Sequence, residues 1–336
     1  MSSLTSFCSS NLELFLHHVT PTVPSRPLPQ SCFNDLNILW QPPGKDIIEY
    51  FTLRDLWDCY DEWSAYGAGT PVLMSGHETV MQYYVPYLSA IQIYTNKSGA
   101  TSRNRKDDSD VAEFESDSWS DDSGSDNLSR SLSNHSSKAW DAVSEDSSLE
   151  QEGSLPMKDR LGCLYLHYIE TASPYWRVPF SDKITELSQS SPALMTLKSV
   201  DLSPASWMAV AWYPIYHIPS QKNEKDLSAC FLSYHTLSST FQDDTLENVD
   251  TNIKHAKCHH EVMGNVGQKS KEESNGGISL PPFGLATYKL QGDLWIKPQT
   301  SDRERIIHLY SAADSWLKQL SIHHHDFNFF TFHATM

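Results

Sequence analysis

Three segments of the chain place apolar side chains three or four positions apart, which is the period of an amphipathic helix. They are 10–19, 52–67 and 301–320, and each opens with Ser or Thr followed three residues later by Asp or Glu, the spacing of a capping box. In the second segment Trp57 lies at the centre of the apolar stripe and Asp58 on the opposite side. We therefore expect three helices, each with one buried face.

Between these helices the pattern is that of β-strands. Segments 82–94 and 161–169 are rich in Tyr, Val, Ile and Leu, and we expect them to pair with each other. Pro86 is expected to bend or interrupt the first of them. Segment 207–213 is continuously apolar, which is typical of a central strand covered on both faces. Segment 229–237 supplies the next strand.

Shorter signals complete this prediction. Prolines recur through 21–29 and indicate an extended connector that lies outside the sheet. Segment 181–187 predicts one or two helical turns. Residues 283–290 and 294–296 flank the sequence Gln291-Gly292-Asp293, which is a hairpin signal.

The order of helices, then strands, then a closing helix favours an α+β fold. We expect a mostly antiparallel sheet with packed helices in a single domain spanning 10–332, interrupted by two polar insertions at 98–155 and 240–278. The first insertion is Ser-rich and holds 14 acidic residues against five basic ones between 98 and 154. We expect both insertions to be disordered, because they have too few apolar residues to offset the entropy of ordering.

Charge and cysteine content limit the classes of partner and compartment. The net charge of −17 argues against a nucleic-acid surface, which needs a concentrated Lys/Arg footprint. The six cysteines are scattered without a C-x-x-C pair, which favours a reducing compartment. The N-terminus lacks a secretory or organelle signal, and no apolar run is long enough to span a bilayer. We expect a cytoplasmic or nuclear protein without a membrane partner or a cofactor.

Seven blocks of the sequence resemble a plant family catalogued as domain of unknown function 789. The blocks are long, unusual in composition and in the order expected for that family; they are 50–57, 61–67, 173–179, 201–207, 213–216, 229–238 and 326–330. The resemblance covers nearly the whole predicted body. It implies a plant source and one domain, and it brings no established activity or catalytic residue to carry over.

Motifs that carry chemistry are few. There is no Gly-x-Ser-x-Gly elbow, no P-loop and no His-Glu-x-x-His helix, which disfavours an ordinary hydrolase or kinase. A His/Cys cluster has tight spacing but no second pair, so we expect no metal site; its members are His255, Cys258, His259, His260 and Glu261. The run 323–325 of three histidines fits a helix C-terminus without any ligand.

One set of side chains on or beside the predicted central strands is a candidate ligand site. The set consists of Trp176, Arg177, Asp201, Trp212, Tyr213, His217 and His235. Aromatic rings beside one Arg and two His suit a pocket for a planar or anionic ligand. The structural alternative is that Trp176 and Trp212 are core residues, that Arg177 pairs with Asp201 or caps a loop, and that both histidines are hydrogen-bonded strand residues.

The acidic insertion offers regulatory chemistry. Ser118, Ser123 and Ser147 each have an acidic residue three positions later, the spacing that acid-directed kinases favour. These observations favour a non-enzymatic interaction or regulatory module of plant cells, which displays a phosphorylatable acidic insertion to a protein partner with a basic surface. The alternative is an enzyme or small-molecule binder that uses the aromatic/Arg/His set.

Overall fold

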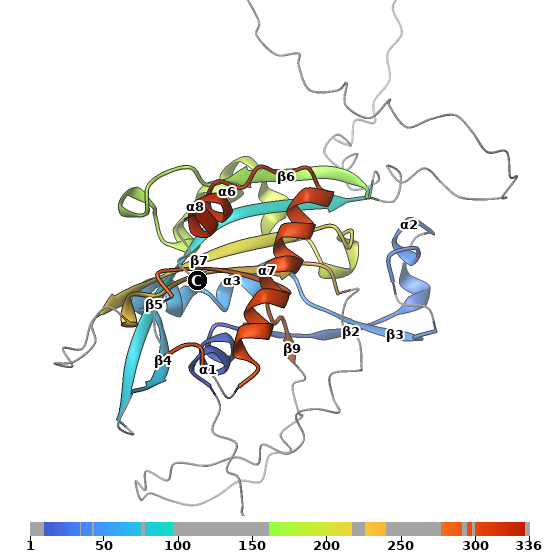
Figure 1. Ribbon diagram of the computed structural model, residues 1–336. Helices are drawn as coiled ribbons and strands as arrows, with labels where there is room; N and C mark the ends of the chain where they lie inside the picture. The colour runs from blue at the N-terminus through green and yellow to red at the C-terminus, as the bar shows by residue number, and fades with distance from the viewer. Residues whose placement is uncertain are drawn as a thin grey trace, which may run out of the picture.

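The centre of the structure, a computed structural model, is an antiparallel β-sheet (Figure 1). The structure describes residues 10–33, 35–41, 44–74, 78–96, 161–216, 226–239, 277–290, 294–297 and 300–332. Within these ranges six strands form the main sheet in the order β10-β8-β7-β5-β4, with β6 also paired to β5. Their bounds are β4 (Ala68–Leu73), β5 (Thr79–Thr95), β6 (Cys163–Ile169), β7 (Trp207–Tyr216), β8 (Cys230–Thr236) and β10 (Gly284–Tyr288).

Strand β5 is the long element that organises this sheet. One edge of β5 pairs with β7. Along its other edge, β4 pairs with residues 79–84 of β5 and β6 pairs with residues 90–95. The predicted pairing of the strands before and after the acidic insertion is thus confirmed. The strand continues through Pro86, which lies in the interval that neither β4 nor β6 accompanies, where a residue without an N–H is tolerated.

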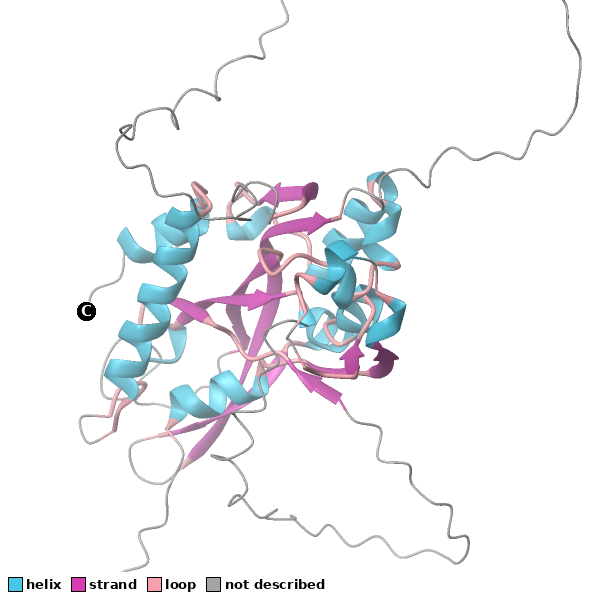
Figure 2. Cartoon of the chain, turned by 90° about the vertical axis from the view of Figure 1, so that its right-hand side faces the viewer, coloured by secondary structure: helices cyan, strands magenta, loops and turns pink. Residues whose placement is uncertain are grey.

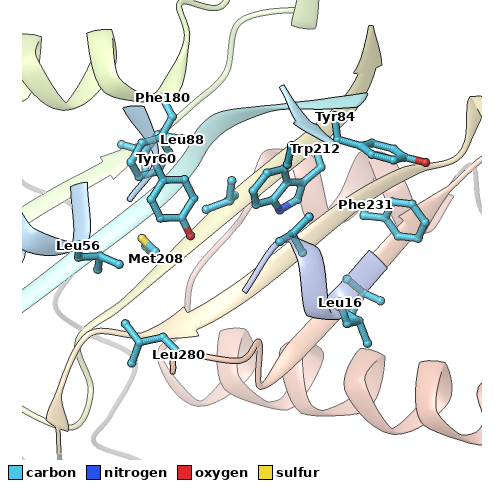
Figure 3. Packing of buried hydrophobic residues seen from close by; sticks show 14 of the residues in the cluster. Leu16, Leu56, Tyr60, Tyr84, Leu88, Phe180, Met208, Trp212, Phe231 and Leu280 are labelled. Atoms are coloured by element: carbon cyan, nitrogen blue, oxygen red, sulfur yellow. The ribbon is translucent and has the colours of Figure 1, made fainter. Parts of the chain in front are cut away.

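The first face of the sheet is covered by four helices from the N-terminal and middle parts of the chain. They are α1 (Asn11–His18), α3 (Leu53–Asp58), α4 (Asp61–Tyr66) and α6 (Phe180–Ser190). Large rings fill the space between these helices and the strands (Figure 3). Phe15 stacks on Phe231 with ring centroids 3.9 Å apart, and Tyr60 stacks on Phe180 at 4.2 Å. Burial of this aromatic layer is the main support of the fold.

The second face is covered by the two C-terminal helices, α7 (Asp302–Gln319) and α8 (His325–Phe332). Figure 1 shows α7 crossing the sheet, and Figure 2 shows helices on both sides of the strands. A Cβ at Gly284 would lie 2.8 Å from the Cβ of Ala313, so the glycine lets α7 approach β10 closely. Trp207 and Tyr234 form the floor beneath these helices, with ring centroids 5.8 Å apart.

Two small sheets and several short helices complete the described part of the chain. Strand β1 (Thr22–Pro24) pairs with β9 (Gly277–Ser279), and β2 (Arg26–Pro29) pairs with β3 (Ile47–Tyr50). The short helices are η1 (Gln30–Cys32), α2 (Asp35–Ile38), η3 (Pro174–Trp176), η4 (Pro192–Met195), η5 (Ser199–Asp201) and η6 (Asp226–Ser228).

Three of the four prolines of 21–29 therefore lie in strands, namely Pro24, Pro27 and Pro29, and the predicted connector outside a sheet is wrong. Both strands belong to two-stranded sheets, where an edge position tolerates a missing N–H. The predicted insertion 240–278 also ends too late, because Ile278 pairs with Val23 and is buried. Residues 98–155 and 240–276 lie outside the described residues.

The α+β class with a mostly antiparallel sheet is confirmed, and so are most of the predicted elements. The helix expected over 52–67 is two short helices, because helix α3 ends before Cys59 and α4 begins after Tyr60. The predicted capping box and apolar stripe are present. Helix α7 begins where expected, but the Ser301 side chain makes no capping bond. Residues 294–297 form a turn and no strand, so the predicted hairpin is wrong, and 291–293 lie outside the described residues.

Candidate functional site

Arg177 lies beneath α8 and is held by an internal carboxylate. Its Nη1 and Nη2 donate to the two carboxylate oxygens of Asp326 at 2.6 and 2.7 Å, and its Nε donates to the carbonyl of Ala172 at 2.9 Å. Both charged side chains are only 2% exposed. The predicted pairing of Arg177 with Asp201 is wrong: Asp201 instead accepts a hydrogen bond from Asn37 at 2.8 Å.

The ion pair continues into a chain of buried hydrogen bonds, here called the Arg177 network. It comprises Arg177, Asp326, Ser89, His324 and Tyr234. The Ser89 hydroxyl donates to Asp326 at 2.5 Å, so it must accept from the His324 Nε2–H at 2.9 Å. Since Nε2 carries the proton of a neutral imidazole, Nδ1 accepts from the Tyr234 hydroxyl at 2.7 Å. In this assignment each donor hydrogen of Ser89, His324 and Tyr234 meets an acceptor atom.

Local features of the sequence place these side chains together. The register of β5 against β7 shifts between Leu88 and Ala90, and Ser89, which lies at this β-bulge, points to the second face. Tyr234 projects from β8 to the same face, since alternate residues of a strand point to opposite sides. His324 ends the link between α7 and α8, and Asp326 lies in the first turn of α8. The network therefore joins β5, β8, α8 and the turn before Arg177.

Burial and the neighbouring charges fix the protonation states of the network. Burial alone would raise the pKa of Asp326, but the hydrogen bonds and charge of Arg177, with Ser89, hold it below its usual value. Burial lowers the pKa of His324 to about 4 and raises the pKa of Tyr234 well above its usual value. Near neutral pH the network thus contains one charged pair, a neutral imidazole and a protonated phenol.

Ser89, His324 and Asp326 are the residue types of a serine hydrolase, but their roles here differ. In a nucleophilic triad the serine donates to the imidazole and the imidazole donates to the carboxylate. Here Ser89 donates directly to Asp326, and the second imidazole nitrogen faces a tyrosine. All three side chains are buried, so no substrate reaches the hydroxyl. The arrangement connects elements of the fold and is unsuited to nucleophilic catalysis.

His235 lies on the opposite face of the sheet from the Arg177 network. Its Nδ1 donates to the Leu280 carbonyl and its Nε2 accepts from the Ser233 hydroxyl, both at 2.9 Å. The same hydroxyl accepts from the Trp212 indole at 2.9 Å. Burial lowers the pKa of His235 to about 4, so its imidazole is neutral near pH 7. This histidine is a satisfied core residue.

The structure consequently does not bring the predicted set together. Tyr213 is half-buried, with its ring 5.9 Å from that of Tyr87 and 6.2 Å from that of Phe330, near Arg177. Asp201 and His235 lie elsewhere in the fold. The remaining predicted site residues fall outside the described residues; they are His217, Ser118, Ser123 and Ser147. The His/Cys cluster 255–261, where no metal site is expected, also lies outside them. Among the described residues, no group of three or more His, Cys, Asp or Glu is placed to hold a metal ion.

Trp176 is an exposed residue, so the alternative that placed it in the core is wrong. It belongs to η3, where Pro174 occupies the first turn and the Trp176 N–H donates to the Ser173 carbonyl at 2.9 Å. Tyr175 and Trp176 are 94% and 84% exposed, whereas the next residue, Arg177, turns inward. We call Tyr175 and Trp176 the aromatic turn. Arg177 anchors this turn, because its side chain is bonded to Asp326 and to the Ala172 carbonyl.

Sequence reasoning missed Asp326, Ser89, His324 and Tyr234 as partners of Arg177. The available signal was physical, since a buried guanidinium needs a carboxylate, but a sequence does not say which of many acids supplies it. Asp326 follows Arg177 by 149 residues. The bulge at Ser89 has no sequence signature of its own.

Comparison with known proteins identifies a family and no activity. No curated protein matches the chain, and no solved structure matches it. Within the described residues, no helix is long and apolar enough to cross a membrane. The family model described as "Protein of unknown function (DUF789)" matches residues 10–330, which include the aromatic turn, Arg177 and Asp326. The chain therefore belongs to the DUF789 family.

Proposed function

We propose that the chain is a non-enzymatic interaction module, whose body presents exposed aromatic side chains to a protein partner. One observation carries the proposal: Arg177 is engaged inside the fold by Asp326, while Tyr175 and Trp176 immediately before it are exposed. A guanidinium kept for an anionic ligand would need its donors free in the unliganded protein. Here three of its N–H groups are already in use.

The anchoring of the aromatic turn supports a binding role. Tyr and Trp are the residues most enriched among those that dominate binding energy at protein interfaces, and they lose little conformational freedom when they bind. The buried ion pair holds the backbone of the turn in place, since Arg177 contacts both Ala172 and α8. A turn already fixed in its bound form loses less entropy on association. Exposed aromatic rings on a fixed turn therefore suit recognition of a partner.

The proposal extends to the Ser-rich insertion, which lies outside the described residues. Ser118, Ser123 and Ser147 are proposed phosphoacceptors of an acid-directed kinase in the cytoplasm or nucleus of plant cells. Each phosphate would add about −1.5 to −2 charge and strengthen attraction to a basic partner surface. Mass spectrometry of protein purified from plant tissue should find phosphate on these serines. Unmodified peptides under several growth conditions would contradict this part of the proposal.

Affinity purification with a variant of the aromatic turn tests the main proposal. Tagged wild-type protein, the double variant Tyr175→Ser/Trp176→Ser and the control Leu164→Ser are expressed equally in plant cells, and the retained proteins are quantified. Leu164 is an exposed apolar residue of β6, outside the turn. We expect wild type and control to retain the same proteins and the double variant to lose them. Equal retention by all three, or no protein enriched above an untagged sample, would contradict the proposal.

A further inference from the structure

The chain contains five serine or threonine residues that stand directly before a proline, and all five lie in the described part of the chain. They are Thr20, Thr70, Ser173, Ser191 and Ser203. Kinases that select Ser-Pro or Thr-Pro read the proline itself, which has no N–H, has a fixed φ and holds the preceding residue extended. The fold determines which of the five hydroxyls such a kinase can reach.

Four of the five side chains are covered at least in part. Thr70 is fully buried, and Ser203 is only 1% exposed. Thr20 is half-buried, and its hydroxyl donates to a backbone carbonyl of α1 at 2.6 Å. Ser191 is half-buried at the end of α6, where its N–H is bonded to the last turn of that helix. None of these four positions therefore presents an exposed side chain to a kinase.

Ser173 is the exposed member of the set. It lies between β6 and the aromatic turn, with φ −58° and ψ 147°, which is extended backbone close to polyproline II. Its side chain makes no capping bond to η3, so the following turn does not hold the hydroxyl. An exposed hydroxyl on extended backbone before Pro174 meets the requirements of a proline-directed kinase. Position 176 is a tryptophan, so this site differs from the acid-directed serines of the insertion.

The charges around Ser173 show what a phosphate there would meet. From residue 170 to residue 182 the only basic side chain is Arg177, and three of its N–H groups are already bonded inside the fold. The Glu170 carboxylate accepts from two backbone N–H groups of the same loop, at 2.9 and 2.8 Å. A phosphate on Ser173 thus has no uncommitted cation in this stretch to draw it inward. It stays at the surface, next to the aromatic turn.

We propose that Ser173 is a phosphorylation site of a proline-directed kinase and that the phosphate switches off binding by the aromatic turn. In the transfer, Ser173 Oγ bonds to the γ-phosphorus of ATP while the bond from that phosphorus to the β,γ-bridging oxygen breaks. ADP leaves, and the hydroxyl proton passes to the catalytic base of the kinase.

The switching role rests on the proposed interaction function. The phosphate adds about −1.5 to −2 charge beside a turn whose exposed side chains, Tyr175 and Trp176, are uncharged. A partner that covers these rings must then remove water from the phosphate, which opposes association. Phosphorylation should therefore release partners that the unmodified turn retains.

Phosphate transfer to the native full chain tests the site itself. The chain is incubated with ATP and a purified mitogen-activated protein kinase, and mass spectrometry measures occupancy at all five positions. We expect phosphate on Ser173 and at least about tenfold less at the other four, because reaching those requires local unfolding. Pro174→Ala keeps the hydroxyl and removes the recognised proline, so it should abolish transfer. Absence of phosphate on Ser173, or equal transfer to wild type and Pro174→Ala, would overturn the site.

Retention of proteins from plant cell extract tests the switch. The immobilised chains are phosphorylated wild type, unphosphorylated wild type, and Ser173→Ala carried through the same kinase treatment. Proteins that depend on Tyr175 and Trp176 should be retained about tenfold less, or lower still, by the phosphorylated chain and undiminished by Ser173→Ala. Equal retention by both wild-type forms would overturn the switch. If no retained protein depends on the aromatic turn, the interaction function and the switch both fail, whereas the kinase assay, which involves no partner, decides the site separately.

Discussion

The Arg177 network and the exposed residues Met81 and Ile215 lie on the same side of the same sheet, and Ser89 and Met81 belong to consecutive parts of β5. Near Ser89, α8 covers the strand, and every charged group beneath it has an internal partner. Near Met81 no described helix covers this side of the strand, and Met81 and Ile215 are 39% and 38% exposed. The comparison teaches that the conspicuous polar residues of this chain stabilise the fold, whereas its candidates for recognition are exposed rings.

We expect the largest loss of stability from a substitution in the buried Arg177 network. Asp326→Ala leaves the Arg177 guanidinium buried without its carboxylate, which should lower the free energy of unfolding by about 3–5 kcal/mol. Urea denaturation measures the loss. Met81→Ser is the control on the exposed side and should change stability by less than about 0.5 kcal/mol. Similar losses for the two variants would contradict the assignment of the two regions.

Two tryptophans, one buried and one exposed, provide a second comparison of stability losses. Trp57 is buried, and its indole donates to the Leu194 carbonyl at 2.9 Å, so Trp57→Ala should cost about 3–5 kcal/mol. Trp176→Ala and Asp58→Ala remove exposed side chains and should be nearly silent. The urea-denaturation midpoints of the three variants measure these differences in stability. Equal midpoints for Trp57→Ala and Asp58→Ala would refute the assigned face of α3.

Acidification should lower the stability of the fold through its two buried histidines. Burial holds the pKa values of His324 and His235 at about 4, below the ordinary value of 6.5, so the unfolded chain binds more protons between these pH values. Stability should therefore rise from pH 4 to pH 6.5 and fall on acidification, with each histidine contributing on the order of 3 kcal/mol. Urea titrations across this range measure the slope. A flat profile would show that these imidazoles stay accessible to protons.

A smaller loss is expected when the charge at Arg177 is kept and its geometry is changed. Arg177→Lys retains a cation but cannot make the two parallel bonds to Asp326 or the bond to Ala172, so we expect a loss of about 1–3 kcal/mol. Thermal shifts with a panel of anionic metabolites provide the second measurement. A compound that stabilises wild type and fails to stabilise the variant would favour the small-molecule alternative.

The sequence predicted elements better than it predicted the site, for physical reasons. Helical spacing identified the buried face around Trp57, and the continuous apolar run of 207–213 identified a strand covered on both faces, because such patterns report burial directly. Strand β9 has three residues, too few for a pattern, and was missed within the predicted insertion. Trp176 was assigned to the core from its residue type alone, although a single turn of 3₁₀ helix has no period that could place it.

The partners of Arg177 could not be predicted because they depend on tertiary structure. Their positions follow from a bulge at Ser89, from the sheet order and from the docking of α8, none of which a local pattern specifies. The exposed stretch of β5 could not be predicted either, because Met81 is exposed and Gln82 is buried, the reverse of what their polarity suggests. What the sequence does not show is that the covering helices stop before reaching it.

The most direct test of the central claim is a urea-denaturation cycle of Arg177→Met, Asp326→Leu and the double variant. If Arg177 is a structural partner of Asp326, each single variant should lose about 3 kcal/mol or more, because it leaves one buried charge uncompensated. The double variant should then lose less than either single one. A ligand anchor without an internal partner would behave in the opposite way, so an Arg177→Met variant as stable as wild type would contradict the account.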